Sequence, residues 1–171
     1  MKAKLPILLS LVAMIGGVFI SIIFGANEEF FKARISKGLE NNAKIQSILD
    51  PGEKAQKIKT EHDKNWRYYQ RYHFHATGVS SLSLVVLLLL AFVQTGTKEA
   101  TIASYMVALG GFCYPFVWLF AGIYGPEMGR EEAKEAFAFL GYMGGVFLLG
   151  IIYTLILAII RPWKEPFAKL G

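Results

Sequence analysis

Four long stretches of the sequence contain no Asp, Glu, Lys, Arg or His, and they constrain the fold more than any other feature. Each is at least as long as the roughly 20 residues that a helix needs to cross the apolar layer of a bilayer. A backbone in lipid must satisfy its own hydrogen bonds, so these stretches are expected to be helices. The sequence therefore predicts an all-α, polytopic membrane protein with four transmembrane helices, at residues 5–26, 76–97, 100–125 and 136–160.

The charged sequence between the first two spans, residues 27–75, predicts an extramembrane helical hairpin. Asn27 offers a side-chain oxygen at one helix start, and Asp50, Pro51 and Glu53 form the pattern of a second one, with a cap, a proline at the first position and an acid three residues after the cap. The arms on either side of this turn are both 23 residues long, about 35 Å each. Two antiparallel helices would therefore leave and rejoin the membrane at one level.

Glycine and proline predict where the spans pack and bend. Gly17, next to a second glycine, predicts a close approach of the first span to a neighbouring helix. Gly141 and Gly145, four residues apart, predict a second packing face on the fourth span. Pro115 is expected to kink the third span, because it removes a backbone donor and clashes with the preceding turn.

The distribution of basic residues leaves two orientations open. The hairpin side carries twelve Lys and Arg and the side of the termini six, which favours a cytoplasmic hairpin. Lys2 and Lys4 before the first span, with Glu28 and Glu29 after it, favour the reverse, and the first helix often decides. We take cytoplasmic termini as the working prediction.

Several function classes lack their usual residues. No ionisable side chain lies in any span, which argues against ion-coupled transport by this chain alone. There is no glycine-rich phosphate loop or paired-cysteine motif, and the single Cys113 permits no internal disulfide. The formal charge of +5 fits contact with lipid headgroups better than contact with nucleic acid.

Candidate ligands gather where the hairpin meets the second span. The segment 67–78 combines imidazoles, guanidinium groups and phenols, and its candidate cofactor-binding residues are Arg67, Tyr69, Arg71, Tyr72, His73 and His75. His73 and His75 differ by about 200° around a helix, so they point to opposite sides and cannot hold one metal ion together. They are therefore candidates to ligate two different partners.

The run His73-Phe74-His75 resembles the His-Phe-His of the haem-copper oxidase catalytic subunit, in which one helix ligates two haems from opposite faces. The resemblance covers three residues, and the further histidine ligands of that family have no counterpart here, so it implies no oxidase activity. It does suggest a haem b, with Arg67 and Arg71 pairing with the propionates. The second axial ligand would come from Met128, from Met143, or from a partner or second copy.

Two function classes follow from these features. The first is a small membrane subunit or accessory protein of a larger, for example respiratory, complex, which docks on its partner through the hairpin. The second is a haem b cytochrome or quinone-interacting electron carrier that uses His73 and His75. The plain alternative for segment 67–78 is a belt of aromatic and basic side chains at the membrane interface. A pore built from several copies is a further alternative, and catalysis by this chain alone has no candidate nucleophile or base.

Overall fold

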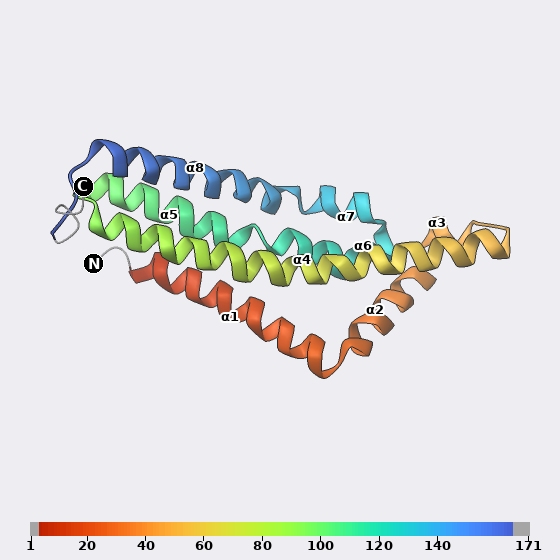
Figure 1. The fold of residues 1–171 in the computed structure, drawn as a ribbon. Coiled ribbons are helices and arrows are strands. Elements are labelled where there is room, and N and C mark those ends of the chain that lie inside the picture. Colours follow the sequence, from red (N-terminus) through yellow and green to blue (C-terminus); the bar gives the residue numbers. More distant parts are fainter. Residues whose placement is uncertain (1–3, 166–171) are drawn as a thin grey trace.

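The computed structural model describes residues 4–165, and this part of the chain is all-helical (Figure 1). It contains no β-strand, only an isolated bridge between Val93 and Trp163. The helices, in chain order, are α1 (Lys4–Ala26), α2 (Glu28–Glu40), α3 (Ala43–Gln46), α4 (Pro51–Phe92), α5 (Thr97–Cys113), α6 (Phe116–Met128), α7 (Arg130–Ala136) and α8 (Ala138–Ile160).

Four helical segments are long and apolar enough to cross a membrane, as predicted. They are α1, the apolar part of α4, the α5–α6 pair and α8. Large apolar side chains cover the outside of this bundle, among them Phe19 on α1, Leu88 on α4 and Ile159 on α8. An apolar exterior of this extent is compatible with contact to lipid. The start of α1 and the end of α8 lie at the same end of the bundle.

Helix starts between residues 27 and 75 follow the local signals. The Asn27 side chain accepts a hydrogen bond from the Phe30 N–H at 3.1 Å, so α2 starts afresh after α1. The Asp50 carboxylate accepts from the Glu53 N–H at 2.6 Å and Pro51 takes the first helical position, which confirms the predicted start of α4. α4 then runs for 42 residues without a break.

The first arm of the predicted hairpin is two helices rather than one. α2 ends at Asn41, and α3 begins after Asn42, whose side-chain oxygen accepts from the Ile45 N–H at 3.2 Å. The same side chain donates through Nδ2 to the Pro126 carbonyl at the end of α6, at 2.9 Å. Asn42 therefore caps a helix and joins it to a distant element with one amide group.

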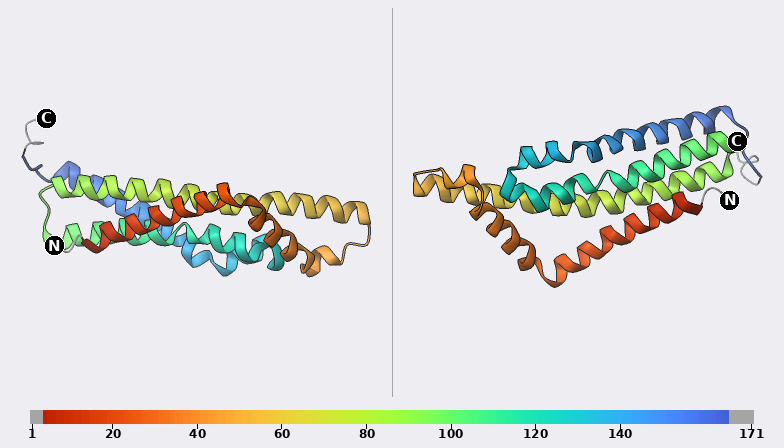
Figure 2. Two further views of the ribbon diagram at one scale, coloured as in Figure 1. Left: turned by 90° about the horizontal axis from the view of Figure 1, so that it is seen from below. Right: turned by 180° about the vertical axis from the view of Figure 1, so that it is seen from behind.

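α2 turns at the end of α1 toward α4, continues toward α3, and packs against both α4 and α6 (Figure 2). Aromatic rings from three helices fill the angle between α1 and α4. The ring centroid of Phe24 lies 4.9 Å from that of Phe31 and 5.1 Å from that of Trp66. The ring centroid of Phe31 lies 5.1 Å from that of Tyr69. On the other side of α2, a Cβ on Gly38 would meet the Pro126 Cβ at 2.6 Å. The apolar side of α2 is thus buried by this chain itself.

Both later spans are interrupted. The third breaks at Tyr114 and Pro115, as the proline predicts, and α6 then continues beyond the apolar block to Met128. The fourth begins as the charged α7 and breaks at Phe137 before α8, which the sequence did not signal.

Glycine contacts confirm one prediction and correct another. A Cβ on Gly17 would come within 2.9 Å of the Ala76 Cβ, so α1 and α4 approach closely there, as predicted. The predicted face on the fourth span is wrong: a Cβ on Gly145 would meet no described atom within 4 Å, and one on Gly141 only a side chain at 3.9 Å. Gly110 and Gly150 instead let α5 and α8 approach each other.

Candidate functional site at the α4 junction

The six predicted site residues all project from α4, which is one unbroken helix. Successive residues are turned by about 100°, so a single helix distributes them around its axis. The structure places them against different neighbours instead of bringing them together. His73, Tyr72 and Tyr69 lie toward α1 and α2, whereas Arg71 and His75 lie toward the break between α5 and α6.

His73 is engaged with α1. Its Nδ1 lies 2.8 Å from the Gly17 carbonyl oxygen. The Tyr72 hydroxyl lies against Gly16, and on its other side the Tyr72 ring meets Phe116 at 5.7 Å. One turn on, the contact of Gly17 with Ala76 closes the space between the two helices. A flat macrocycle has no room between α1 and α4 at this level.

His75 lies in a cluster formed with the residues around the α5–α6 break. Its ring centroid is 5.2 Å from that of Tyr114 and 5.7 Å from that of Trp118. The Arg71 guanidinium lies 4.9 Å from the centre of the Trp118 ring, a cation–π contact. We call Arg71, His75, Tyr114 and Trp118 the His75 cluster. The Trp118 Nε1 in this cluster is buried and has no hydrogen-bond partner among the described residues.

Hydrogen bonding fixes the same tautomer on both histidines. The His75 Nδ1 lies 2.8 Å from the Arg71 carbonyl oxygen, as the His73 Nδ1 does from that of Gly17. A carbonyl oxygen only accepts, so each Nδ1 carries a proton and donates it. The Nε2 atom is then the one left to bind a ligand or accept a proton, an arrangement common in ligating histidines.

The remaining predicted residues belong to other surroundings. Tyr69 is buried among Phe31, Ile35 and other side chains of the α1–α2–α4 core, where packing accounts for its position. Arg67 lies exposed on α4, one turn before Arg71 on the same face of the helix. Neither Arg67 nor Tyr69 is among the hydrogen-bond or ring partners of His73 and His75 in the described residues.

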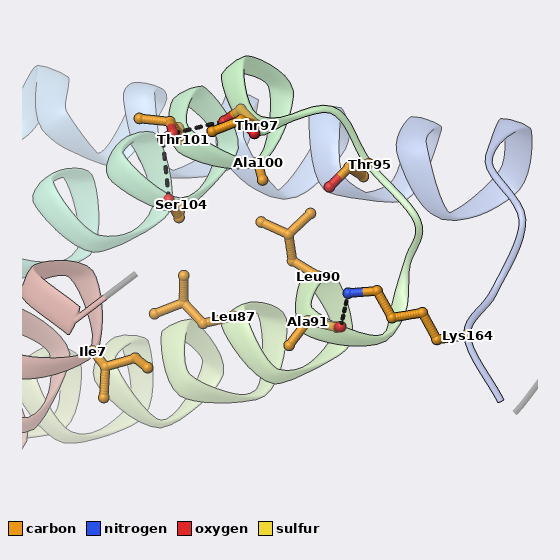
Figure 3. Close-up of a pocket in the computed structure, with 10 residues that line it drawn as sticks. All are labelled: Ile7, Leu87, Leu90, Ala91, Thr95, Thr97, Ala100, Thr101, Ser104 and Lys164. Atoms are coloured by element: carbon orange, nitrogen blue, oxygen red, sulfur yellow. Dashed lines mark hydrogen bonds between the residues drawn. The ribbon is translucent and has the colours of Figure 1, made fainter. Parts of the chain in front are cut away.

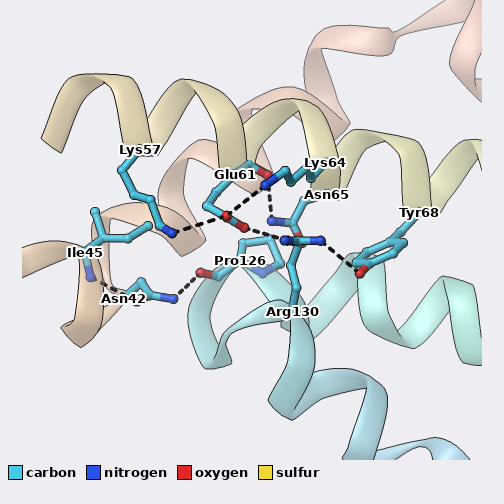
Figure 4. Close-up of polar contacts among 9 residues, drawn as sticks. All are labelled: Asn42, Ile45, Lys57, Glu61, Lys64, Asn65, Tyr68, Pro126 and Arg130. Carbon is cyan, nitrogen blue, oxygen red and sulfur yellow. Dashed lines mark hydrogen bonds and ion pairs between the residues drawn. The ribbon is translucent and has the colours of Figure 1, made fainter. Parts of the chain in front are cut away.

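A second polar cluster, which the sequence did not indicate, lies further out along α4 (Figure 4). The Arg130 Nε of α7 donates to the Glu61 carboxylate at 2.6 Å, and its Nη1 lies 3.5 Å from the Tyr68 hydroxyl. Lys57 and Lys64 approach the same carboxylate at 3.7 and 3.8 Å. Burial disfavours the charged Arg130, but the bonds to Glu61 and Tyr68 outweigh it and raise the pKa of Arg130.

This second cluster ties α7 to α4. The Glu61 side chain is only 12% exposed, and the cationic groups of Arg130, Lys57 and Lys64 surround its carboxylate. Asn65, on the next turn, is fully buried and donates to the Glu61 carbonyl at 2.8 Å, while its side-chain oxygen lies against Gly125 without a described partner. Glu61, Asn65 and Arg130 are largely buried between α4, α6 and α7, which favours a structural role, while Lys57 and Lys64 remain largely exposed.

Neither cluster is a closed metal centre. Within residues 4–165 no group of three or more His, Cys, Asp or Glu side chains is arranged to hold a metal ion. Comparison with protein families, curated proteins and solved structures finds no match to this chain. The geometry of the chain is therefore the basis for a functional proposal.

Proposed function

We propose that this protein is a small integral-membrane subunit or accessory protein of a larger membrane complex, and that it binds its partner through the tip of the extramembrane helices. The tip, residues 47–51, joins α3 to α4 and lies at the end of the molecule opposite the termini (Figure 1). The observation that carries the proposal is Leu49, whose side chain is 96% exposed at this tip.

Hydrogen bonds close to Leu49 hold the backbone of the tip in place. Asp50 caps α4 immediately after it, and Lys54 donates to the Gln46 side chain across the turn at 2.7 Å. Of the two isoleucines before Leu49, Ile45 is buried and Ile48 is partly buried. Burying this exposed leucine, which lies outside the apolar bundle, would contribute about 1.5–3 kcal/mol to a complex, less the cost of ordering its side chain.

The setting of the proposal is the bilayer, with the termini on the cytoplasmic side and the tip on the other. The apolar exterior of α1, α4 and α8 would contact lipid. The partner would be another membrane or peripheral protein, or a second copy of this chain.

Photo-crosslinking in native membranes tests the proposal. A benzophenone amino acid at position 49 should crosslink one partner protein, while the same group at the exposed Gln56 of α4 serves as the control. Leu49→Asp should reduce recovery of that partner about tenfold or more, since about 1.5 kcal/mol or more is lost. Equal crosslinking at both positions, or full recovery with Leu49→Asp, would reject the tip as the docking surface.

A second candidate function is ligation of a haem b, or contact with a quinone, by His75. It is favoured by the donated Nδ1 proton, which leaves the His75 Nε2 as a ligand. Gly78 and Leu82 follow on the same side of α4; Leu82 is exposed, and a Cβ on Gly78 would meet no described atom within 4 Å. A flat cofactor would fit there rather than on the α1 side, and a partner or second copy would supply the other axial ligand.

A reduced-minus-oxidised visible spectrum of gently solubilised native material tests this candidate. A sharp α-band that disappears in His75→Ala and remains in His73→Ala would identify a cytochrome with His75 as its ligand. A flat spectrum from material that retains its partner would exclude haem and leave quinone contact and the docking function.

A further inference from the structure

A cavity of about 570 Å³ lies between α1, α4 and α5, at the end of the bundle that carries the termini (Figure 3). This volume is in the range of about 300–1,000 Å³ typical of sites for small molecules. Its walls come from three helices and from the segment after α8, and the lining residues are Ile7, Leu87, Leu90, Ala91, Thr95, Thr97, Ala100, Thr101, Ser104 and Lys164.

The inner part of this cavity offers apolar surface. Leu87 and Leu90 are buried in its wall. The two inner hydroxyl groups use their protons within their own helix: Thr101 Oγ donates to the Thr97 carbonyl at 2.7 Å, and Ser104 Oγ donates to that of Thr101 at 3.0 Å (Figure 3). Water would find few donors here, and protein interiors leave little space empty, so an apolar chain fits this space best.

The mouth of the cavity, in contrast, carries a positive charge. The Lys164 ammonium donates to the Ala91 carbonyl at 2.7 Å, which holds it beside the opening. The backbone N–H of Lys164 donates to the Phe92 carbonyl at 2.8 Å, and the Gln94 N–H donates to the Pro162 carbonyl at 2.8 Å. These two bonds fix the segment after α8 on the end of α4 and the α4–α5 loop. An ammonium has three N–H donors and can bind a carbonyl and an anionic oxygen together.

We infer that this cavity binds one acyl chain of an anionic phospholipid, with the phosphate of its headgroup at Lys164. The chain would lie between Leu87, Leu90 and Ile7, and the headgroup would remain at the level of the membrane surface, where basic residues attract anionic lipids. The inference depends on the membrane setting proposed above and is independent of docking at Leu49.

Native mass spectrometry of the full-length protein from mild detergent provides the test. The probes are dioleoylphosphatidylglycerol, dioleoylphosphatidylcholine and oleate. The wild-type protein should retain phosphatidylglycerol about fivefold more strongly than phosphatidylcholine, the effect of one basic residue near a headgroup. Lys164→Gln should abolish this preference. Lys98→Gln, which removes a neighbouring exposed charge outside the cavity, should leave it unchanged.

Filling the cavity tests the acyl-chain part. Thr101→Phe should reduce retention of both phospholipids, and Ala91→Phe at the mouth gives the same test if the first variant does not fold. Equal retention of the two phospholipids by the wild type, or equal effects of Lys98→Gln and Lys164→Gln, would overturn the inference. Stronger binding of oleate than of phosphatidylglycerol would replace the phospholipid with a fatty acid. Failure to enter bilayers at all would instead remove the membrane proposal.

Discussion

The absence of a side chain at Gly17 sets how closely α1 can approach α4. A Cβ there would lie 2.8 Å from the Thr77 side chain and 2.9 Å from that of Ala76, both closer than van der Waals contact allows. The same close approach brings the Gly17 carbonyl within 2.8 Å of the His73 ring. One small residue therefore determines both a helix contact and the tautomer of a candidate ligand.

Gly17→Val should destabilise the protein by about 1–3 kcal/mol, because the added methyl groups force the two helices apart. Gly145→Val is the matched control, since a Cβ at that position meets no described atom within 4 Å and the change should stay within about 0.5 kcal/mol. Thermal unfolding of both variants in the same detergent measures the difference. Equal midpoints for the two variants would contradict the close contact.

Local chemistry explains which residues the sequence could predict. The cap at Asp50 and the break at Pro115 depend on a few adjacent residues, so both were predicted correctly. The partners of His75 could not be predicted, because Tyr114 and Trp118 reach it only through the way α5 and α6 pack on α4. For the same reason glycine spacing misidentified the contact face at Gly145.

At the scale of helices, the part of the protein near the tip is held by links between elements far apart in the sequence. Asn42 joins α3 to the end of α6, Lys44 pairs with Glu132 of α7, and Arg130 pairs with Glu61 of α4. The sequence predicted helices here and a turn at Pro51, but not that α6 and α7 extend to meet them. These charge pairs join residues 88 and 69 positions apart, so they leave no local pattern in the sequence, and the predicted hairpin includes neither α6 nor α7.

The link between α3 and α7 should depend on pH. The hydrogen bond and charge of Lys44 lower the pKa of Glu132 below its usual value of 4.5. A lowered pKa means that the stabilisation is present above the unfolded-state pKa and is lost as the pH falls through the folded-state value. The wild type should therefore lose more stability than Glu132→Gln between pH 6 and about pH 3, measured as the unfolding midpoint in detergent. Parallel pH curves would show that the pair contributes nothing, as exposed pairs often do.

At the scale of the whole molecule, α4 is the only described helix that runs from the tip to the end that carries the termini (Figure 1). The tip and the lipid-sized cavity are both partly built from it, at opposite ends. Four apolar helices and their order could be predicted from the sequence, because hydrophobic length depends on composition alone. Orientation in the bilayer could not, because the two charge arguments oppose each other.

A single cysteine at the tip tests the orientation. In a Cys113→Ser background, Gly52→Cys places a thiol in the exposed first turn of α4. With cytoplasmic termini, a membrane-impermeant maleimide should label it from outside intact cells, and the yield should not rise when the cells are opened. Labelling that requires opened cells would place the tip in the cytoplasm and reverse the proposed topology.

The unbroken length of α4 also sets the distance between the tip and the membrane surface. From Pro51 to Trp66, which packs against Phe24 near the end of the first span, the helix is 16 residues long, about 24 Å, with no break at which it could shorten or fold over. In the proposed setting, this stretch holds Leu49 at a constant height above the headgroups. A partner must present its binding surface at that height, so a thin protein lying flat on the membrane would pass beneath the tip, whereas one rising about 25 Å from it would meet it.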